Sequence, residues 1–297
     1  MAQATAFKTY DAVGNREDLS DIIAIVAEED APMYNRFAKA KAMATYTEWQ
    51  TDSLASAAKN ANIEGANNSY ALASSTTRLG DYTQIFKKFV KVSGTQEVVD
   101  KAGRDSEVSY QKMKRLREIM RDVEYALVNG TGNSGATGTA RELTGVLARI
   151  TTSIGTGTGT GTETLTEAMY NNNLQEIYTL GGEAHATYAN AWQQRKIAAF
   201  STPNARTEMT GDGEISAYVN VYYSQFGRME IIPDRQMTST IIANLQDDMW
   251  SVAELRGINY KVTDVDADAI TGRYLGELTL RAHNETSSGK ITGLKTA

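Results

Sequence analysis

A single long helical pattern, over residues 93–129, constrains this chain more than any other feature of its sequence. It begins at Ser93-Gly94-Thr95-Gln96, which has the Ser-x-x-Gln spacing of a capping box, and it ends at the C-cap signal Asn129-Gly130. About 33 helical residues with a rise of ~1.5 Å each predict a rod of about 50 Å, far longer than an average helix. No heptad repeat is sustained, so a coiled coil is the weaker explanation. The apolar stripe is carried by Val99, Ala102, Met113, Leu116, Met120, Val123 and Leu127, with only Ser106 and Tyr110 in its middle.

The segment before this helix, residues 44–92, predicts a long hairpin without a core of its own. Residues 45–50 and 82–92 alternate and are rich in Thr and aromatic side chains, as β-strands are. The residues between them are mostly Ala, Asn and other small or polar types, as in 59–68. Because isolated two-stranded ribbons are marginal in water, this ribbon is expected to rest on a partner.

The remaining sequence predicts a mixed α+β architecture. Residues 7–15 read as an extended arm, and two short helices are expected, over 18–27 and, after Pro32, over 33–41. Gly- and Thr-rich stretches at 131–139 and 155–162 read as surface loops. The second half predicts helices at 165–180 and 192–200 and a mainly antiparallel set of strands at 143–150, 186–189, 215–223, 228–232, 239–245, 250–255, 260–265 and 274–282.

Composition excludes several classes of function. The 297 residues contain 30 Lys and Arg against 36 Asp and Glu, a net charge of −6, so the chain is not a strongly basic nucleic-acid binder. With no Cys and two His, it lacks the residues for thiolate zinc sites, disulfides and cysteine nucleophiles. No signal peptide and no apolar stretch of ~20 residues is present, which predicts a soluble protein made in a cytoplasm and no membrane partner.

Two motifs resemble ligand sites without matching them. Gly130-Thr131-Gly132-Asn133-Ser134-Gly135 fits G-x-G-x-x-G, but it follows a predicted helix instead of a strand, so it is interpreted as a connection. Asp264-Val265-Asp266-Ala267-Asp268 resembles the start of a calcium loop, but Ala269 and Leu275 stand where that motif needs Gly and Glu. A solvated turn is the preferred interpretation, and cation binding by Asp264, Asp266 and Asp268 stays open. No catalytic triad or phosphate loop is found, so neither an enzyme nor a cofactor is expected.

One side of the long helix is basic. Its cations are Lys112, Lys114, Arg115, Arg117 and Arg121. They form either a solvated face opposite the apolar stripe or a surface that contacts acidic residues of a neighbouring subunit.

The order of arm, short helix, hairpin, long helix, mixed region and final strand resembles the major capsid proteins of tailed bacteriophages with the Hong Kong 97-type fold. Particular strings look like a podophage-like subgroup of these head proteins: Tyr10-Asp11-Ala12-Val13-Gly14-Asn15, Glu48-Trp49-Gln50-Thr51-Asp52, Arg78-Leu79-Gly80-Asp81-Tyr82, Val92-Ser93-Gly94-Thr95-Gln96-Glu97, Ile231-Ile232-Pro233-Asp234-Arg235 and Arg281-Ala282-His283-Asn284-Glu285. The resemblance covers nearly the whole chain and is weakest at 131–162 and 202–213.

The resemblance implies a structural role and a division of the chain. It implies an arm with a short helix (1–43), an extended hairpin loop (44–92), a peripheral domain (93–142 and 256–297) and an axial domain (143–255). The subunits would form pentamers and hexamers of an icosahedral phage head around double-stranded DNA, which they would contact non-specifically. Scaffolding, portal and possibly decoration proteins would be separate, and the protein would be in the host cytoplasm during assembly and then in the virion. The implied inter-subunit contacts are Glu48, Trp49, Lys59, Glu64, Arg78, Lys112, Arg115 and Arg117.

Three further points follow from the resemblance. Some relatives link a Lys of the extended loop to an Asn of a neighbour, but no cross-link motif accompanies Lys59, so no such bond is expected here. An encapsulin-like compartment shell is an alternative within the same fold. Another phage structural protein, such as a tail component, is a second alternative, although those proteins are commonly rich in strands throughout.

Overall fold

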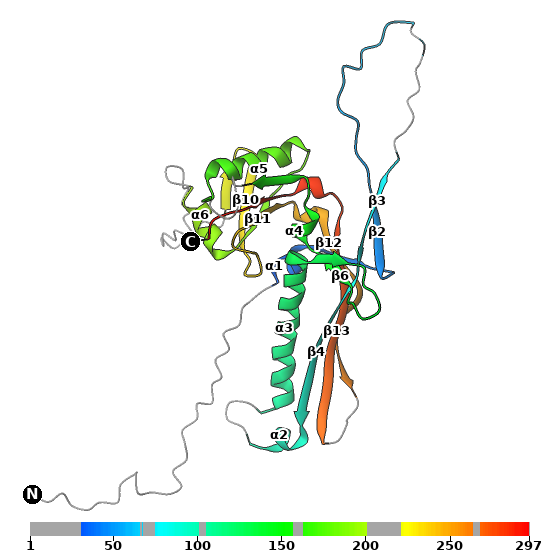
Figure 1. The fold of residues 1–297 in the computed structure, drawn as a ribbon, viewed down its shortest axis with the longest axis vertical. Helices are drawn as coiled ribbons and strands as arrows, with labels where there is room; N and C mark the ends of the chain where they lie inside the picture. Colours follow the sequence, from blue (N-terminus) through cyan, green and yellow to red (C-terminus); the bar gives the residue numbers. More distant parts are fainter. Residues whose placement is uncertain are drawn as a thin grey trace, which may run out of the picture.

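The computed structural model describes residues 31–65, 67, 75–100, 105–156, 163–200, 221–263 and 268–296. The predicted arm at 7–15, the helix at 18–27 and the residues Asp264 and Asp266 lie outside these ranges. Within them the chain has the expected mixed α+β composition, arranged as two sheets with a long helix and a projecting hairpin (Figure 1).

The first sheet has four strands in the order β1-β12-β13-β4. The strand β1 (Ala38–Lys41) is parallel to β12 (Trp250–Thr263), and β13 (Ala269–Ala282) runs antiparallel to both β12 and β4 (Gln84–Ser93). The helix α3 (Glu107–Asn129) lies along one face of this sheet (Figure 1), where Val108 packs on Val90 and Val92. The stripe predicted for the long helix is right only near its carboxyl end, where Val123 and Leu127 are fully buried. Met113 and Leu116, predicted on the same stripe, are 47% and 41% exposed.

The long helix is shorter than the sequence predicts. Ser93 caps a first helix, α2 (Gly94–Val98), by accepting a hydrogen bond from the Gln96 amide, as the capping box indicates. The continuous helix, however, begins only after Ser106, whose hydroxyl accepts from the Ser109 amide, and it has 23 residues instead of about 33. The Glu97 carboxylate accepts from the amides of Glu107 and Val108, at 2.9 and 3.1 Å, and thus caps the second helix from the first. The break falls where the apolar stripe is weakest.

The hairpin is formed by β2 (Tyr46–Thr51) and β3 (Thr77–Tyr82), which pair in antiparallel register from Tyr46 with Tyr82 to Thr51 with Thr77. The strand predicted over 82–92 is wrong as a single hairpin strand, because the chain changes sheets at Thr83 and β4 pairs with β13. Thr83 is fully buried, and its hydroxyl donates to Glu277 on β13 at 2.7 Å. This buried bond fixes the point where the hairpin leaves the sheet.

The second sheet has six strands in the order β7-β14-β11-β8-β10-β9. These strands are β7 (Ser153–Thr156), β14 (Gly289–Thr292), β11 (Ile242–Leu245), β8 (Ala186–Ala189), β10 (Gly227–Pro233) and β9 (Val221–Ser224). Two helices accompany this sheet, α5 (Glu167–Thr179) and α6 (Ala191–Ala198). The predicted helices at 165–180 and 192–200 and the strand at 186–189 are confirmed.

Three local predictions are wrong. The helix expected over 33–41 is a five-residue helix, α1 (Pro32–Arg36), followed by β1, because Phe37 enters the core and the next residues pair with β12. The strand expected over 143–150 is a short strand, β6 (Glu142–Thr144), and one helical turn, α4 (Val146–Arg149); β6 pairs with β5 (Thr131–Asn133). The strands expected at 250–255 and 260–265 are one strand, β12, whose register shifts between Glu254 and Asn259.

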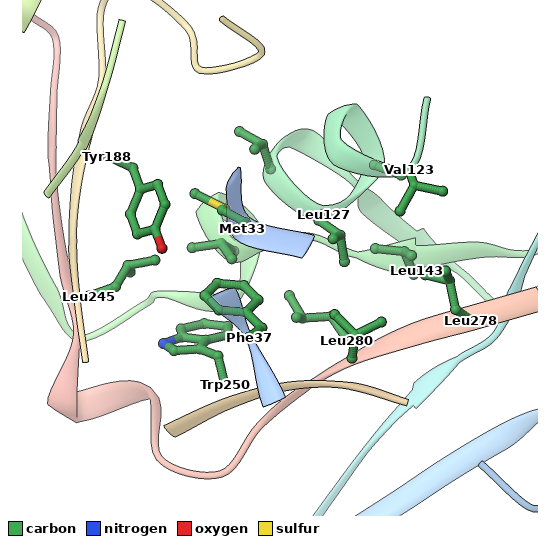
Figure 2. Close-up of a cluster of buried hydrophobic side chains, with 14 of the residues drawn as sticks. Met33, Phe37, Val123, Leu127, Leu143, Tyr188, Leu245, Trp250, Leu278 and Leu280 are labelled. Carbon is green, nitrogen blue, oxygen red and sulfur yellow. The ribbon is translucent and has the colours of Figure 1, made fainter. Parts of the chain in front are cut away.

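One core joins the two sheets. Phe37 stacks on Trp250 with ring centroids 6.1 Å apart, and it meets the edge of Tyr188 on β8 at 6.4 Å (Figure 2). The same cluster contains Leu127 of α3, Leu280 of β13 and Leu245 of β11 (Figure 2). A second cluster lies between the six-stranded sheet and the helices α5 and α6.

Candidate assembly surfaces

The base of the hairpin is held by the buried carboxylate of Asp81 on β3, which is 3% exposed. It accepts hydrogen bonds from both the amide and the hydroxyl of Thr144, each at 2.9 Å, and it lies 3.3 Å from the guanidinium of Arg149. Burial raises the pKa of Asp81, while the Thr144 hydrogen bonds and the Arg149 charge oppose that rise. The hairpin is therefore tied to β6 and α4 through a desolvated polar contact.

Aromatic contacts extend this anchorage along the ribbon. The Arg149 guanidinium lies 5.3 Å from the ring centroid of Trp49, and the rings of Tyr46 and Tyr82 are 4.6 Å apart across the strand pair. Cation–π and aromatic pairs of this kind are each worth about 0.5–1.5 kcal/mol beyond burial. Together with Asp81 they fix the direction in which the hairpin leaves the protomer.

A second buried carboxylate, Glu277 on β13, lies next to this junction. It accepts from the Thr83 hydroxyl at 2.7 Å and forms ion pairs with Arg141 at 2.8 Å and Arg256 at 2.6 Å. Its side chain is 4% exposed, and buried charges of this kind are tolerated only when they are paired. Glu277 therefore connects the four-stranded sheet, the start of β4 and the segment before β6.

The connection between β2 and β3 is exposed, in contrast to the buried base of the hairpin. Leu54 is 98% exposed and Ile63 is 83% exposed, and the charged side chains of Lys59 and Glu64 are also exposed. Among the residues that the structure describes, neither Lys59 nor Glu64 forms an ion pair. In the view of Figure 1 the connection extends well away from the two sheets and α3. A firmly held base thus presents a segment that the described part of its own protomer does not cover.

Several of the predicted contact residues have partners within their own chain. Glu48 pairs with Arg78 across the hairpin at 3.1 Å, and Arg115 pairs with Glu118 along α3 at 2.5 Å. The ammonium of Lys112 lies 4.6 Å from the ring centroid of Tyr260, and Trp49 is half-buried beside Arg149. Only Lys59, Glu64 and Arg117 among the eight are exposed without an ion pair in the described residues. Their role between subunits stays a prediction.

A depression with a mixed polar and apolar lining, which the sequence did not predict, lies between β4 and α3. Ile85, 46% exposed, and Tyr125, 58% exposed, line it together with Phe86, Lys87 and Asp122. Two of its lining residues, Ile85 and Lys87, belong to the alternation of Ile85, Lys87, Phe89 and Lys91 along β4. That pattern shows which residues share a face, but not that β4 would lie at the edge of a sheet with this face uncovered.

No metal-binding or membrane-spanning arrangement is found in the part of the chain that the structure describes. No three His, Asp or Glu side chains there gather closely enough to hold a metal ion. None of the helices described is both long and apolar enough to cross a bilayer. Asp268, the one described member of the predicted aspartate turn, accepts a hydrogen bond from Thr95 at 3.4 Å.

Comparison of the sequence with known families gives a match over almost the full length. The family model of the SU10 major capsid protein matches residues 3–295. The major capsid protein of Escherichia phage Phieco32 is 34% identical over 131 residues, which are 44% of this chain and 37% of that protein. The aligned region thus spans little more than a third of the length of this relative.

Solved structures with a similar fold come from phages and from a GTA particle, and two of them are named as capsids. The chain resembles the capsid of Cyanophage A-1(L) with a TM-score of 0.66 and 14% identity, covering 97% of this chain and 98% of that one. It resembles the capsid of a native GTA particle with a TM-score of 0.68 and 13% identity, covering 96% and 97%. A structure from Mycobacterium phage Bobi gives a TM-score of 0.61 at 12% identity, covering 93% and 95%. These likenesses confirm the predicted α+β, Hong Kong 97-type capsid fold.

Proposed function

The chain belongs to the SU10 major capsid protein family, and from this premise we propose that it assembles through pentamers and hexamers into an icosahedral phage head that encloses double-stranded DNA. The family is a structural one and not an enzyme family, so we expect no catalytic role for this chain. As a capsid component the protein is placed in the virion; assembly in the host cytoplasm is part of the proposal. We also propose that the chain belongs to the podophage-like subgroup of these head proteins.

The observation that carries the proposal is the contrast between the two ends of the hairpin. Asp81 and Thr83 bury the base in the protomer, whereas Leu54 and Ile63 are almost fully exposed at the other end. Exposed apolar side chains on a segment without its own core are stabilised when a neighbouring chain covers them. A shell in which each hairpin lies across the next subunit would bury these residues in every copy.

The two sheets suggest how the chain divides into domains. We assign the peripheral domain to α3 with the four-stranded sheet, and the axial domain to the six-stranded sheet with α5 and α6. Four pieces lie elsewhere than in the division expected from sequence. By strand pairing, β1, β4 and residues 250–255 of β12 join the sheet assigned to the peripheral domain, and β14 joins the sheet assigned to the axial domain. The hairpin proper then ends at Tyr82.

The expected partners follow from the same role. Scaffolding, portal and possibly decoration proteins would be separate chains, and contact with packaged DNA would be non-specific. A net charge of −6 suits a container that must not adhere tightly to its genome. The same fold would also serve an encapsulin-like compartment, and the nucleic acid content of assembled particles separates the two.

Size-exclusion chromatography followed by negative-stain microscopy tests the proposal, with the protein produced alone and together with a candidate scaffolding protein from the same phage. Closed particles or five- and six-membered rings are the expected result. A monomer that persists at every salt concentration, with and without the scaffold, would overturn the shell function. Rods or stacked rings would instead favour a tail component.

A further inference from the structure

The five cations that the sequence places on one side of the long helix do not share one side in the structure. Lys112 and Arg115 have partners within the chain, as described above. Lys114, Arg117 and Arg121 are exposed. With 3.6 residues per turn and a rise of ~1.5 Å, these three positions fall within about 60° around α3 and about 10.5 Å along its axis.

The three exposed cations lie on the side of α3 opposite its packed side. Ile119 and Val123 are fully buried, and their positions are about 120° to 180° around the helix from each of the three. In Figure 1 the helix borders β4 and β13 on one side, and no described helix or strand flanks its other side along most of its length. The cations therefore point away from the protomer.

The carboxylates in the same stretch of α3 do not neutralise these cations. Glu118 and Asp122 are held in ion pairs of 2.5 and 2.7 Å by Arg and Lys side chains other than these three. Glu124 is buried and accepts two backbone hydrogen bonds from α1. Lys114 and Arg117 form no ion pair with any residue that the structure describes. Their charge is therefore available to an anion from outside the protomer.

Two tyrosines extend the cations into a longer row. Tyr110 stands four residues before Lys114, and Tyr125 stands four residues after Arg121, so both fall on the same side of the helix. Tyr125 is 58% exposed and Tyr110 is half-buried. We call the five residues Tyr110, Lys114, Arg117, Arg121 and Tyr125 the outer row. Each of these side chains ends in a hydrogen-bond donor, and none is aliphatic.

The chemistry and spacing of the outer row favour a nucleic-acid backbone over a protein partner. Lys, Arg and Tyr side chains are typical donors to phosphate oxygens. Over about 10.5 Å of its axis, one strand of a DNA duplex carries about three phosphates, one for each cation of the row. A docked protein would be expected to bury an apolar centre, but Met113 is the one exposed aliphatic side chain directly beside the described row.

We propose that the outer row binds the phosphate backbone of the packaged DNA duplex, with Lys114, Arg117 and Arg121 on successive phosphates of one strand. This inference rests on the proposed function, since the duplex must lie inside a shell. It adds the residues that make the contact, and it places the α3 side of each protomer toward the interior. Phosphate contacts carry no base information, so the contact has no sequence preference. Three cations give a weak contact in one copy, and the shell repeats it in every copy.

Salt-dependent DNA binding by the unassembled full-length protomer tests the contact. The anisotropy of a short labelled duplex is measured from 50 to 200 mM NaCl. Three neutralised phosphates predict a slope near −2.7 for log K against log salt, a loss of affinity of about 40-fold over this range. The triple variant Lys114→Gln, Arg117→Gln, Arg121→Gln should bring the slope close to zero, with unchanged circular dichroism.

The matched control removes three exposed cations from the face of the four-stranded sheet that is turned away from α3. Lys91→Gln, Lys261→Gln and Arg273→Gln together should leave the slope unchanged, because these residues lie outside the outer row. Equal flattening by both triple variants would show that overall charge, and not the row, governs binding. If polyglutamate binds the wild type as tightly as the duplex and is lost in the outer-row variant, the row is a site for an acidic protein segment and its assignment to DNA is wrong.

The orientation is tested on assembled shells, because the chain has no Cys and Lys114→Cys supplies a single thiol. A thiol reagent too large to cross the shell should label this position only after the particles are taken apart, and labelling of intact shells would overturn the inference. An outer-row variant that binds DNA normally but no longer forms shells would instead make the row a contact between subunits. Shells from a wild type whose DNA binding ignores the outer row refute the DNA contact alone, whereas absence of shells refutes the proposed function.

Discussion

Asp81 and Arg149, separated by 68 positions in the sequence, form an ion pair of 3.3 Å in which the side chains are 2% and 17% exposed. Because both groups are also hydrogen-bonded or stacked, through Thr144 and Trp49, the pair fixes the hairpin to the body of the protomer. The direction of the hairpin is thus set by buried contacts and not by the exposed part of the ribbon.

Asp81→Asn should destabilise the unassembled protomer by about 3 kcal/mol, since removing one partner of a buried pair leaves the other charge uncompensated. The free energy of unfolding in urea measures this change. Arg78→Gln is the matched control, because its ion pair with Glu48 involves a side chain that is 69% exposed and should be worth less than about 1 kcal/mol. Equal losses for the two variants would contradict the anchoring role of Asp81.

Glu124 should make the stability of the protomer depend on pH. Burial, and to a lesser extent the charge of Asp234, raise the pKa of this carboxyl to about 8, so the folded state binds its proton more tightly than the unfolded state. The stabilisation is complete below the unfolded pKa near 4.5 and is lost as the pH rises toward 8, with a slope of up to about 1.4 kcal/mol per pH unit.

Glu124→Gln isolates this contribution, because glutamine does not titrate and its amide oxygen still accepts one backbone hydrogen bond. Urea unfolding of both proteins between pH 5 and pH 8.5 should show that the difference in unfolding free energy between them changes steadily with pH. A difference that stays constant across this range would show that Glu124 has the same pKa in both states.

Gly130→Ala should lower the free energy of unfolding by about 2–3 kcal/mol. An added Cβ would lie 2.4 Å from the Leu143 carbonyl oxygen and 2.6 Å from the Ala126 carbonyl oxygen. These are backbone atoms, of β6 and of the last turns of α3, so they cannot move aside as a side chain would. Gly257→Ala is the control, since its Cβ would meet only side-chain atoms at ordinary contact distances, Glu254 at 3.5 Å and Asn259 at 3.8 Å. Thermal unfolding compares the two, and a control as damaging as Gly130→Ala would refute the close-approach explanation.

Deleting residues 56–72 should leave a folded protomer that assembles poorly. The double variant Leu54→Ser with Ile63→Ser is a finer test, since both side chains are almost fully exposed and their loss should change protomer stability by less than about 0.5 kcal/mol. Sedimentation velocity should show fewer large particles for both variants, and circular dichroism should show unchanged folding. Normal shells from the deletion would mean that the hairpin does not join neighbours.

The sequence predicted local features well and strand partners poorly. The cap at Ser93 and the strand at 186–189 are encoded by a few adjacent residues, and both are as expected. The break before α3 was missed because Glu97 caps a helix that starts ten residues later. Alternation in β4 identified its two faces but could not reveal that its partner is β13, about 190 positions away.

The anchoring residues were not predicted for the same reason. Asp81 lies in a polar stretch of the hairpin, and only the fold brings Thr144 and Arg149 to it. The overall order of elements nevertheless identified the fold. The succession of hairpin, long helix and mixed region is correct even though the predicted boundaries of several helices and strands are wrong. Glu48 and Lys112, two of the inter-subunit contacts that the resemblance implies, have partners within their own chain, Arg78 and the ring of Tyr260.

The cluster of Phe37, Trp250 and Tyr188 has a mechanical consequence. Because this one close-packed core spans both sheets, bending the protomer between them would open voids around large aromatic side chains, which costs several kcal/mol. We therefore expect the described part of the protomer to resist bending between its two sheets. Any change of curvature or diameter in a shell of these protomers is then expected to occur by sliding or tilting at the contacts between them.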